Sequence, residues 1–189
     1  METVPVYILA GGKSSRIGSD KARFMFKGKP LLTYAAQSIQ PVAASITVVA
    51  DIADKYLDLG YQTIADLQPG LGPLGGIYTA LCHHATDDYF LCISCDRIGI
   101  QPEWLDQLIR AREKNAKAIV FRGEKWHPFP ALYHASLKAQ VQAALAENQL
   151  APWKIFERID VCALNLPSNW DVAVDINNRQ ALDYLTSQG

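Results

Sequence analysis

The residues best suited to chemistry lie in the first loop of the chain, directly after the apolar run at positions 6–9. The run ends at Gly11 and Gly12, and glycine lets the backbone approach a bound group because no Cβ stands in the way. The next positions supply two hydroxyls and three cations: Ser14, Ser15, Lys13, Arg16 and Lys21. Backbone N–H groups, hydroxyls and cations together bind anions. The loop is therefore predicted to hold the phosphates of a nucleotide.

Two glycine-rich segments of the chain also allow interpretations other than a nucleotide site in the first loop. The first loop could be an ordinary strand-to-helix turn with solvated charges, and it is not a Walker A loop because Tyr7 stands where that motif requires glycine. The segment G-L-G-P-L-G at positions 70–75 has the spacing of a dinucleotide fingerprint, and Asp96 follows about twenty residues later. This loop contains Pro69 and Pro73, and the strand before it is short. An NAD(P) oxidoreductase therefore stays as an alternative only.

A carboxylate follows a continuous apolar stretch in the middle of the chain. Residues 89–94 read Y-F-L-C-I-S, as expected of a strand whose two faces are both covered, and Asp96 comes two positions later. Sheets of this kind bind ligands beyond the carboxyl ends of their strands. Mg²⁺ at a nucleotide takes one or two carboxylates plus phosphate oxygens. Asp96 is thus predicted to hold Mg²⁺; the alternatives are a helix cap or a salt bridge to Arg97.

The first loop also resembles a specific family. The sequence L-A-G-G-x-S-x-R-x-G-x-D-K-A, from Leu9 to Ala22, is similar to the signature of the molybdenum cofactor guanylyltransferases, which attach GMP to molybdopterin. In this comparison Lys21 neutralises phosphate charge, and Arg16 can stabilise the charge that develops at the α-phosphorus. The predicted catalytic residues are Arg16, Lys21 and Asp96. The predicted nucleotide site consists of Leu9, Ala10, Gly11, Gly12, Ser14, Ser15, Arg16, Lys21, Asp66, Gly72 and Asp96.

Two later segments resemble the same family. The run D-x-x-P-G-x-G-P-L-x-G-I starts at Asp66, which the resemblance implies lies near guanine or ribose; starting a turn is the alternative role. The run H-P-x-x-A-L-Y starts at His127 and implies an acceptor-side role, and a packed loop histidine is the alternative. Lys154 and Asn177 are the other acceptor-side candidates. Asp175 is the second candidate metal ligand.

Three segments depart from the family pattern, one of them at positions 149–154, where Lys154 is the only basic residue. The run R-I-G-I-Q-P after Asp96 lacks the proline that usually follows this aspartate closely. Positions 174–179 read V-D-I-N-N-R in place of N-x-N-T-P, so Asp175 is a departure and Asn177 keeps its place. The N-N-R resembles the sugar-nucleotide pyrophosphorylase and uridylyltransferase branch. The same reaction with CTP or UTP and another phosphorylated acceptor is therefore retained as an alternative.

The elements that must position these residues alternate between strand and helix. Strands are predicted near 6–9, 45–50, 62–65, 89–94, 118–121, 129–133 and 161–164, and helices near 31–39, 53–59, 75–84, 102–113, 135–147, 153–158 and 178–185. This pattern predicts an α/β fold with a mostly parallel sheet and helices on both faces. With the resemblance, it implies one three-layer domain over residues 1–189, Rossmann-like and of the nucleotide-diphospho-sugar transferase type. The loops at 11–21, 66–76 and 94–99 should then share one edge.

Composition sets further limits. The chain has 18 basic and 19 acidic residues, so nothing favours binding to nucleic acid. The first residues lack the pattern of a signal peptide, and no apolar run reaches the roughly 18 residues of a membrane span, so a cytoplasmic protein is expected. The cysteines at 82, 92, 95 and 162 are expected to be buried thiols. A metal site on Cys92-x-x-Cys95 is disfavoured, because strand positions three apart face opposite ways.

Together these features predict a nucleotidyltransferase. The terminal phosphate of the acceptor would attack the α-phosphorus of a Mg²⁺-bound nucleotide and release pyrophosphate, with catalysis by positioning and charge neutralisation. The resemblance implies GTP and molybdopterin as substrates, Mg²⁺ as cofactor and transient contact with cofactor-delivery proteins. A nucleotide-binding protein without catalytic activity is the remaining alternative.

Overall fold

The computed structural model describes residues 2–11 and 20–176, in which strands alternate with helices. The main sheet contains β1 (Val4–Leu9), β4 (Ala43–Ala50), β5 (Thr63–Ala65), β6 (Tyr89–Ser94), β8 (Ala118–Arg122), β9 (Trp126–His134) and β10 (Val161–Asn165). The helices are α1 (Leu31–Ile39), α2 (Gly72–His83), α3 (Pro102–Arg110), α4 (Lys138–Ala146) and α5 (Pro152–Phe156). Two short antiparallel pairs join β2 (Met25–Phe26) to β3 (Lys29–Pro30) and β7 (Arg97–Ile98) to β11 (Val174–Asp175).

The described strands of the main sheet lie in the order β10-β8-β9-β6-β1-β4-β5. The pairs β1–β4, β1–β6, β4–β5 and β8–β10 are parallel, whereas β9 runs antiparallel to both of its neighbours. The predicted mostly parallel sheet is confirmed, with β9 as the exception. The carboxyl ends of β1, β4, β5 and β6 consequently lie along one edge.

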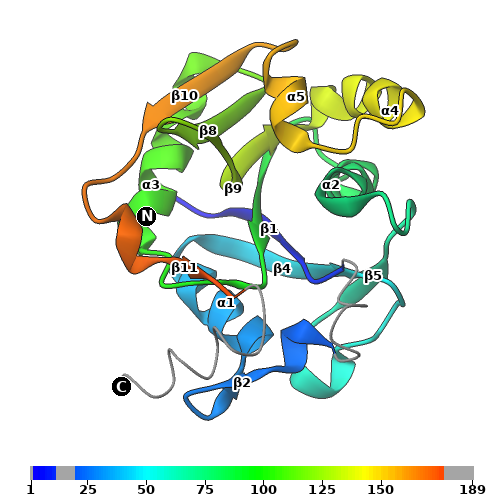
Figure 1. Ribbon diagram of the computed structural model, residues 1–189, viewed down its shortest axis with the longest axis vertical. Helices are drawn as coiled ribbons and strands as arrows, with labels where there is room; N and C mark the ends of the chain where they lie inside the picture. The colour runs from blue at the N-terminus through cyan, green and yellow to red at the C-terminus, as the bar shows by residue number, and fades with distance from the viewer. Residues whose placement is uncertain (1, 12–19, 177–189) are drawn as a thin grey trace.

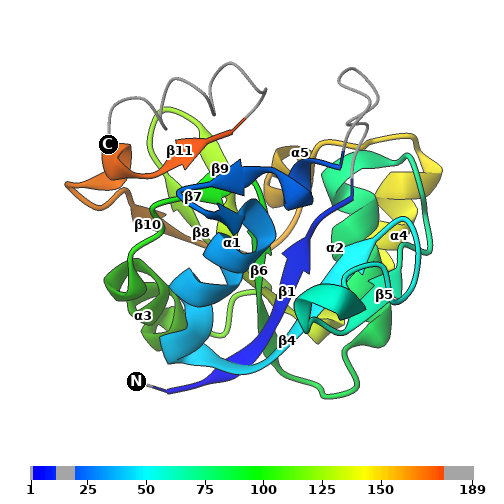
Figure 2. The ribbon, with the colours of Figure 1, turned by 90° about the horizontal axis from the view of Figure 1, so that it is seen from below.

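Helices cover both faces of the sheet, as Figures 1 and 2 show. Alternate residues of β1 enter opposite cores: Val6 and Ile8 pack in one cluster, and Tyr7 and Leu9 pack in the other. The first cluster includes residues of α1 and α3, and the second includes residues of α2, α4 and α5. Because neither face of β1 meets water, its sequence is continuously apolar. The predicted three-layer α/β fold is confirmed.

Helices α1, α2, α3 and α5 begin at or next to a proline. Pro102 occupies the first position of α3, and Pro30 directly precedes α1, positions at which a missing N–H is tolerated. The helix predicted over residues 53–59 is wrong: the structure has turns and one 3₁₀ turn, Leu57–Leu59. Asp54 has a positive φ of 58°, which a right-handed helix cannot contain. The helix predicted near 178–185 lies outside the described residues.

The described part of the chain gives further findings on membrane span, cysteines and metals. None of the helices within residues 2–11 and 20–176 has the length and apolar character that crossing a membrane requires. The cysteines are free, and Cys92, Cys95 and Cys162 are buried, while Cys82 is partly exposed. Burial raises the pKa of the Cys92 thiol far above its ordinary value, so it stays protonated. The same residues contain no group of three metal-ligating side chains.

Candidate functional site

The candidate site lies at the sheet edge where four neighbouring parallel strands end. Gly11 follows β1, Asp51 follows β4, Asp66 follows β5 and Asp96 follows β6. The β1 and β6 ends are tied together, because the Cys95 N–H donates to the carbonyl of Leu9 at 3.1 Å. The predicted residues Gly12, Ser14, Ser15, Arg16 and Asn177 lie outside the described residues. Ala10, between β1 and Gly11, donates its N–H to the Val49 carbonyl at 2.9 Å.

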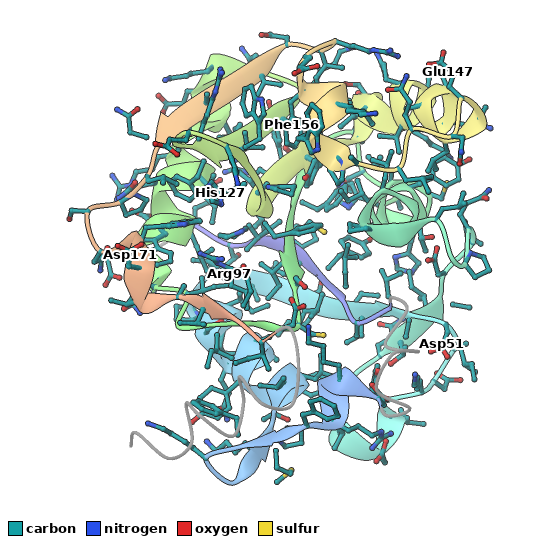
Figure 3. The ribbon with its side chains drawn as sticks, in the orientation of Figure 1. Asp51, Arg97, His127, Glu147, Phe156 and Asp171 are labelled. Carbon is teal, nitrogen blue, oxygen red and sulfur yellow. The ribbon has the colours of Figure 1, made fainter. Side chains whose placement is uncertain are left out.

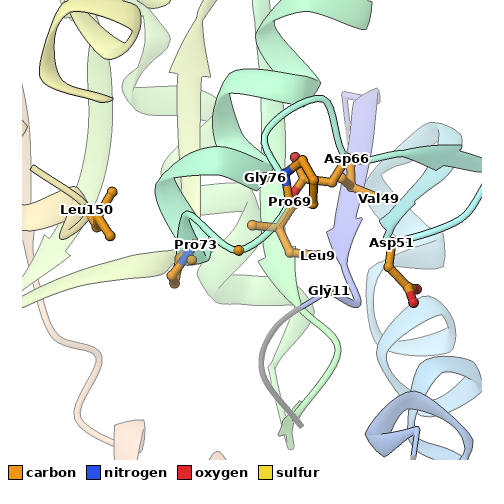
Figure 4. Close-up of a pocket in the computed structure, with 11 residues that line it drawn as sticks. Leu9, Gly11, Val49, Asp51, Asp66, Pro69, Pro73, Gly76 and Leu150 are labelled. Atoms are coloured by element: carbon orange, nitrogen blue, oxygen red, sulfur yellow. The ribbon is translucent and has the colours of Figure 1, made fainter. Parts of the chain in front are cut away.

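A cavity of about 350 Å³ opens at this edge, between β1, β4 and the start of α2 (Figure 4). Its lining residues are Leu9, Gly11, Val49, Asp51, Asp66, Pro69, Gly70, Gly72, Pro73, Gly76 and Leu150. The predicted nucleotide-site residues Leu9, Gly11, Asp66 and Gly72 are thus brought together. Aliphatic and proline side chains form most of the wall. Such a surface suits the flat faces of a base better than it suits phosphate.

Several lining residues were not among the predicted ones. Asp51 could have been found, because it directly follows a buried strand and therefore falls at the same sheet edge. Val49 gives no such signal, because it looks like any buried strand residue. Leu150 arrives from the distant turn after α4, as Figure 4 shows. Only the folded chain brings it to the cavity.

Asp66 both starts a turn and faces the cavity. Its Oδ1 accepts hydrogen bonds from the Gln68 N–H at 3.0 Å and from the Thr79 hydroxyl at 2.7 Å. Thr79 is buried in α2, so these bonds fix the 66–72 loop against that helix. The turn-starting role weighed from the sequence is present. Because Asp66 also lines the cavity, its contact with the nucleotide stays a prediction.

Lys21 and Asp96 form an ion pair at the end of β6. The Lys21 ammonium donates to Asp96 Oδ2 at 2.7 Å, and the Ser94 hydroxyl donates to Asp96 Oδ1. Their side chains are 17% and 24% exposed, so water screens the pair only partly. Asp96 does not pair with Arg97 and does not cap α3, whose N-cap residue is Gln101. Both structural alternatives to a site role are therefore wrong for Asp96.

Asp20 holds the turn that carries Lys21. Its Oδ1 accepts from the Ala22 N–H at 3.1 Å, capping the 3₁₀ turn Lys21–Arg23 (η2), and from the hydroxyl of the fully buried Tyr56 at 2.9 Å. Lys55 lies 3.4 Å from Asp20 Oδ2 and also donates to Asp51 at 2.7 Å. Asp20 therefore links the end of the first loop to the segment that lines the cavity. Sequence reasoning assigned Asp20 no role, because Tyr56 is 36 residues away.

Asp175 lies beside the backbone of Asp96. Its strand β11 pairs with β7, and the Ile176 N–H donates to the Asp96 carbonyl at 2.8 Å. The carboxylate of Asp175 accepts from the Arg97 guanidinium at 3.0 Å through both oxygens. The structure thus brings the two predicted metal aspartates together, but it pairs one of them with arginine. The metal role of Asp175 stays a prediction.

The acceptor-side candidates lie in different surroundings. His127 is half-buried against the Trp170 ring, with 4.9 Å between ring centroids, and Figure 3 labels it together with Arg97. Burial, followed by the charge of Arg97, lowers the pKa of His127, which favours the neutral imidazole. Lys154 is exposed on α5, with its ammonium 5.8 Å from the ring centre of Trp153. No contact joins Lys154 to His127 among the described residues.

The donor set fits Mg²⁺ bound together with a nucleotide. Asp96 presents a partly exposed carboxylate, with a serine hydroxyl beside it, at the edge where the first loop begins. The described residues offer no cage of three ligating side chains. Mg²⁺ does not need one at such sites, since substrate phosphates and waters complete its coordination.

Comparisons with known proteins agree with this architecture. A family model described as "MobA-like NTP transferase domain" matches residues 6–161. A "Probable molybdenum cofactor guanylyltransferase" of Flavobacterium johnsoniae is 35% identical, over 88% of this chain and 87% of the relative. A "Molybdenum cofactor guanylyltransferase" of Serratia proteamaculans is 31% identical, over 78% and 76% respectively.

Solved structures share the fold. The crystal structure of molybdopterin-guanine dinucleotide biosynthesis protein A from Archaeoglobus fulgidus has a TM-score of 0.81 and 23% identity, covering 100% of this chain and 98% of that one. A structure of CMP:2-keto-3-deoxy-manno-octonic acid synthetase complexed with CTP has a TM-score of 0.75 and 11% identity, with 98% of each chain covered. At these identities the structures establish the fold. Through the family match and its relatives, the chain belongs to the MobA-like NTP transferase family.

Proposed function

We propose that this protein transfers GMP from GTP to the terminal phosphate of molybdopterin and releases pyrophosphate. The observation that carries the proposal is the cavity of about 350 Å³ next to the Lys21–Asp96 pair at the sheet edge. A mainly apolar cavity and a charged pair of side chains thus lie along the same sheet edge. The relatives named as molybdenum cofactor guanylyltransferases support GTP and molybdopterin as the two substrates.

Different residues would contact different parts of GTP. Leu9, Val49 and Pro73 would contact the faces of guanine, and Asp66 would accept from the base or ribose. Gly11 and the following loop would receive the phosphates, with Lys21 moving from Asp96 to a phosphate oxygen. Arg16 would meet the charge that develops at the α-phosphorus.

The reaction requires one bond to form and one to break. An oxygen of the acceptor phosphate would attack the α-phosphorus, and the bond from that phosphorus to the bridging oxygen of pyrophosphate would break. Asp96 would hold Mg²⁺, which supplies neutralisation of phosphate charge when bound. His127 would face the acceptor as a neutral donor or acceptor of hydrogen bonds, and Lys154 and Asn177 would contact its polar groups.

We treat residues 1–189 as one nucleotidyltransferase domain. The GTP substrate and the four free thiols favour the cytoplasm as the place of reaction, with transient transfer of the product to a delivery protein.

The first test is thermal unfolding with Mg²⁺ and GTP, CTP, UTP, ATP or NADH in turn. A nucleotide at a hundred times its dissociation constant should add about 2.7 kcal/mol to the free energy of unfolding. Stabilisation by GTP, followed by pyrophosphate release that requires molybdopterin, is the expected result. Stabilisation by CTP or UTP alone would keep the proposed reaction but replace GTP as the substrate. Stabilisation by NADH alone would overturn the proposal of nucleotidyl transfer. GTP binding without transfer would favour the non-catalytic alternative.

A further inference from the structure

Two departures from the family pattern contact each other in the folded chain. Arg97 stands in the unusual run after Asp96, and Asp175 stands in the unusual run near the end of the chain. They are 78 residues apart in the sequence, yet Arg97 Nη1 lies 3.0 Å from each carboxylate oxygen of Asp175. The contact therefore joins two segments that are distant in the sequence.

Arg97 is buried against the ring of Trp170. Its side chain is only 8% exposed, while that of Asp175 is 50% exposed. The guanidinium carbon lies 4.5 Å from the centre of the Trp170 ring, and His127 packs on the same ring. Within the described residues, Arg97 Nε is buried without a hydrogen-bond partner. A cation buried in this way depends on its carboxylate, since removing one partner of such a pair leaves an uncompensated charge.

The pair joins two segments that frame Asp96. It lies across the β7–β11 pairing, directly before the hydrogen bond from Ile176 N–H to the Asp96 carbonyl. On the same side, Gly99 has a φ of +83°, and a Cβ there would collide with the Val172 carbonyl. These contacts therefore fix the position of β7 relative to β11.

The pair also sets the charge beside the site. A free carboxylate at position 175 would repel the phosphates of both proposed substrates. Arg97 cancels that charge without leaving an exposed cation of its own. Lys21 and Asp96 form a second such pair, so each of the two aspartates has a cationic partner.

We infer that Arg97 is a positioning residue that holds β11 against Asp96 and neutralises Asp175, and that Asp175 serves Arg97 rather than a metal ion. The inference rests on the proposed function, because its consequence is measured on GMP transfer. Arg97 itself need not touch either substrate. Its effect should appear with the acceptor more than with GTP, because His127, the proposed acceptor-side residue, packs on the same Trp170 ring as Arg97.

The experiment compares R97Q, D175N and R97Q/D175N in the full chain. We expect R97Q to lower kcat/KM for molybdopterin at least about tenfold, with the GTP dissociation constant within about threefold of the unsubstituted protein. The double variant should recover to within about threefold, because two neutral amides leave no unpaired charge. D175N should leave the Mg²⁺ concentration for half-maximal rate within about twofold. R110Q, which removes the exposed Arg110–Asp106 pair on α3, is the matched control.

Three results would overturn the inference. A D175N protein that needs at least about tenfold more Mg²⁺, where R97Q does not, would make Asp175 a metal ligand. A double variant as weak as the two single effects combined would show no coupling, and an R97Q protein that behaves like R110Q would show no role. Denaturant unfolding of the unsubstituted protein, R97Q, D175N and R97Q/D175N tests the coupling without catalysis. If the unsubstituted protein transfers no GMP, the proposed function fails, and the unfolding cycle still decides whether the pair exists.

Discussion

Replacing Asp96 by asparagine removes a charge while keeping the side chain's shape. In the structure Asp96 accepts from Lys21 and from the Ser94 hydroxyl, and an asparagine oxygen can still accept one of these bonds. A hydrogen bond between charged groups contributes about 1.5–3 kcal/mol, and part of it would remain. We therefore expect the free energy of unfolding to fall by about 1–2 kcal/mol. For a chain of this size that lowers Tm by about 2–8 °C.

D96N should lower turnover without weakening the binding of GTP in the absence of Mg²⁺. Lys21 is neutralised by Asp96 before ligand arrives, so D96N frees the ammonium for a phosphate. GTP without Mg²⁺ should bind D96N as well as the unsubstituted protein, or up to about tenfold more tightly. Turnover with Mg²⁺ should fall at least about a hundredfold, because the carboxylate proposed to hold the ion is gone.

Calorimetry with GTP in EDTA and in Mg²⁺ measures the first effect, and pyrophosphate release measures the second. Asp106→Asn is the control, because it alters another partly exposed aspartate that pairs with arginine on α3. Full turnover in D96N would refute the metal assignment. If D96N lost both turnover and GTP affinity in EDTA, the idea that Lys21 must leave Asp96 to bind a phosphate would be refuted.

Three further predictions concern the parts that support the site. Gly99→Ala should destabilise the fold by at least about 2 kcal/mol more than Gly28→Ala, because both have a φ near +80° but only the first meets a backbone carbonyl. Equal losses in denaturant unfolding would contradict the clash. Tyr56→Phe should lower the free energy of unfolding by about 1 kcal/mol and raise KM for GTP, since the buried hydroxyl donates to Asp20. An unchanged KM would show that the Tyr56–Asp20 hydrogen bond does not position Lys21 for GTP. Burial and a neighbouring guanidinium lower the pKa of His127, so its contribution to stability is present above about pH 6.5 and is lost as pH falls below it. His127→Gln should flatten that acid-side loss, and an unchanged pH profile of the unfolding midpoint would argue against the lowered pKa.

The sequence was sufficient for the features that depend on local pattern. The continuously apolar runs of β1 and β6 indicate strands covered on both faces, and their alternation with helices indicates a parallel sheet. From that sheet follows the edge where Gly11, Asp66 and Asp96 are expected together. The helix predicted over residues 53–59 was wrong because Asp54 adopts a left-handed backbone conformation, which a right-handed helix cannot contain. The sequence gives no clear signal for that conformation.

Tertiary structure decided the partners. Whether Asp96 meets Arg97 next to it or Lys21 far from it depends on the direction in which the chain leaves β6. The link from Asp20 to Tyr56, the pairing of Arg97 with Asp175, and the arrival of Leu150 at the cavity all join distant positions. The periods of strands and helices describe only neighbours along the chain. Contacts between distant residues are set by how the layers pack, and so the charge pattern of the site became visible only in the folded protein.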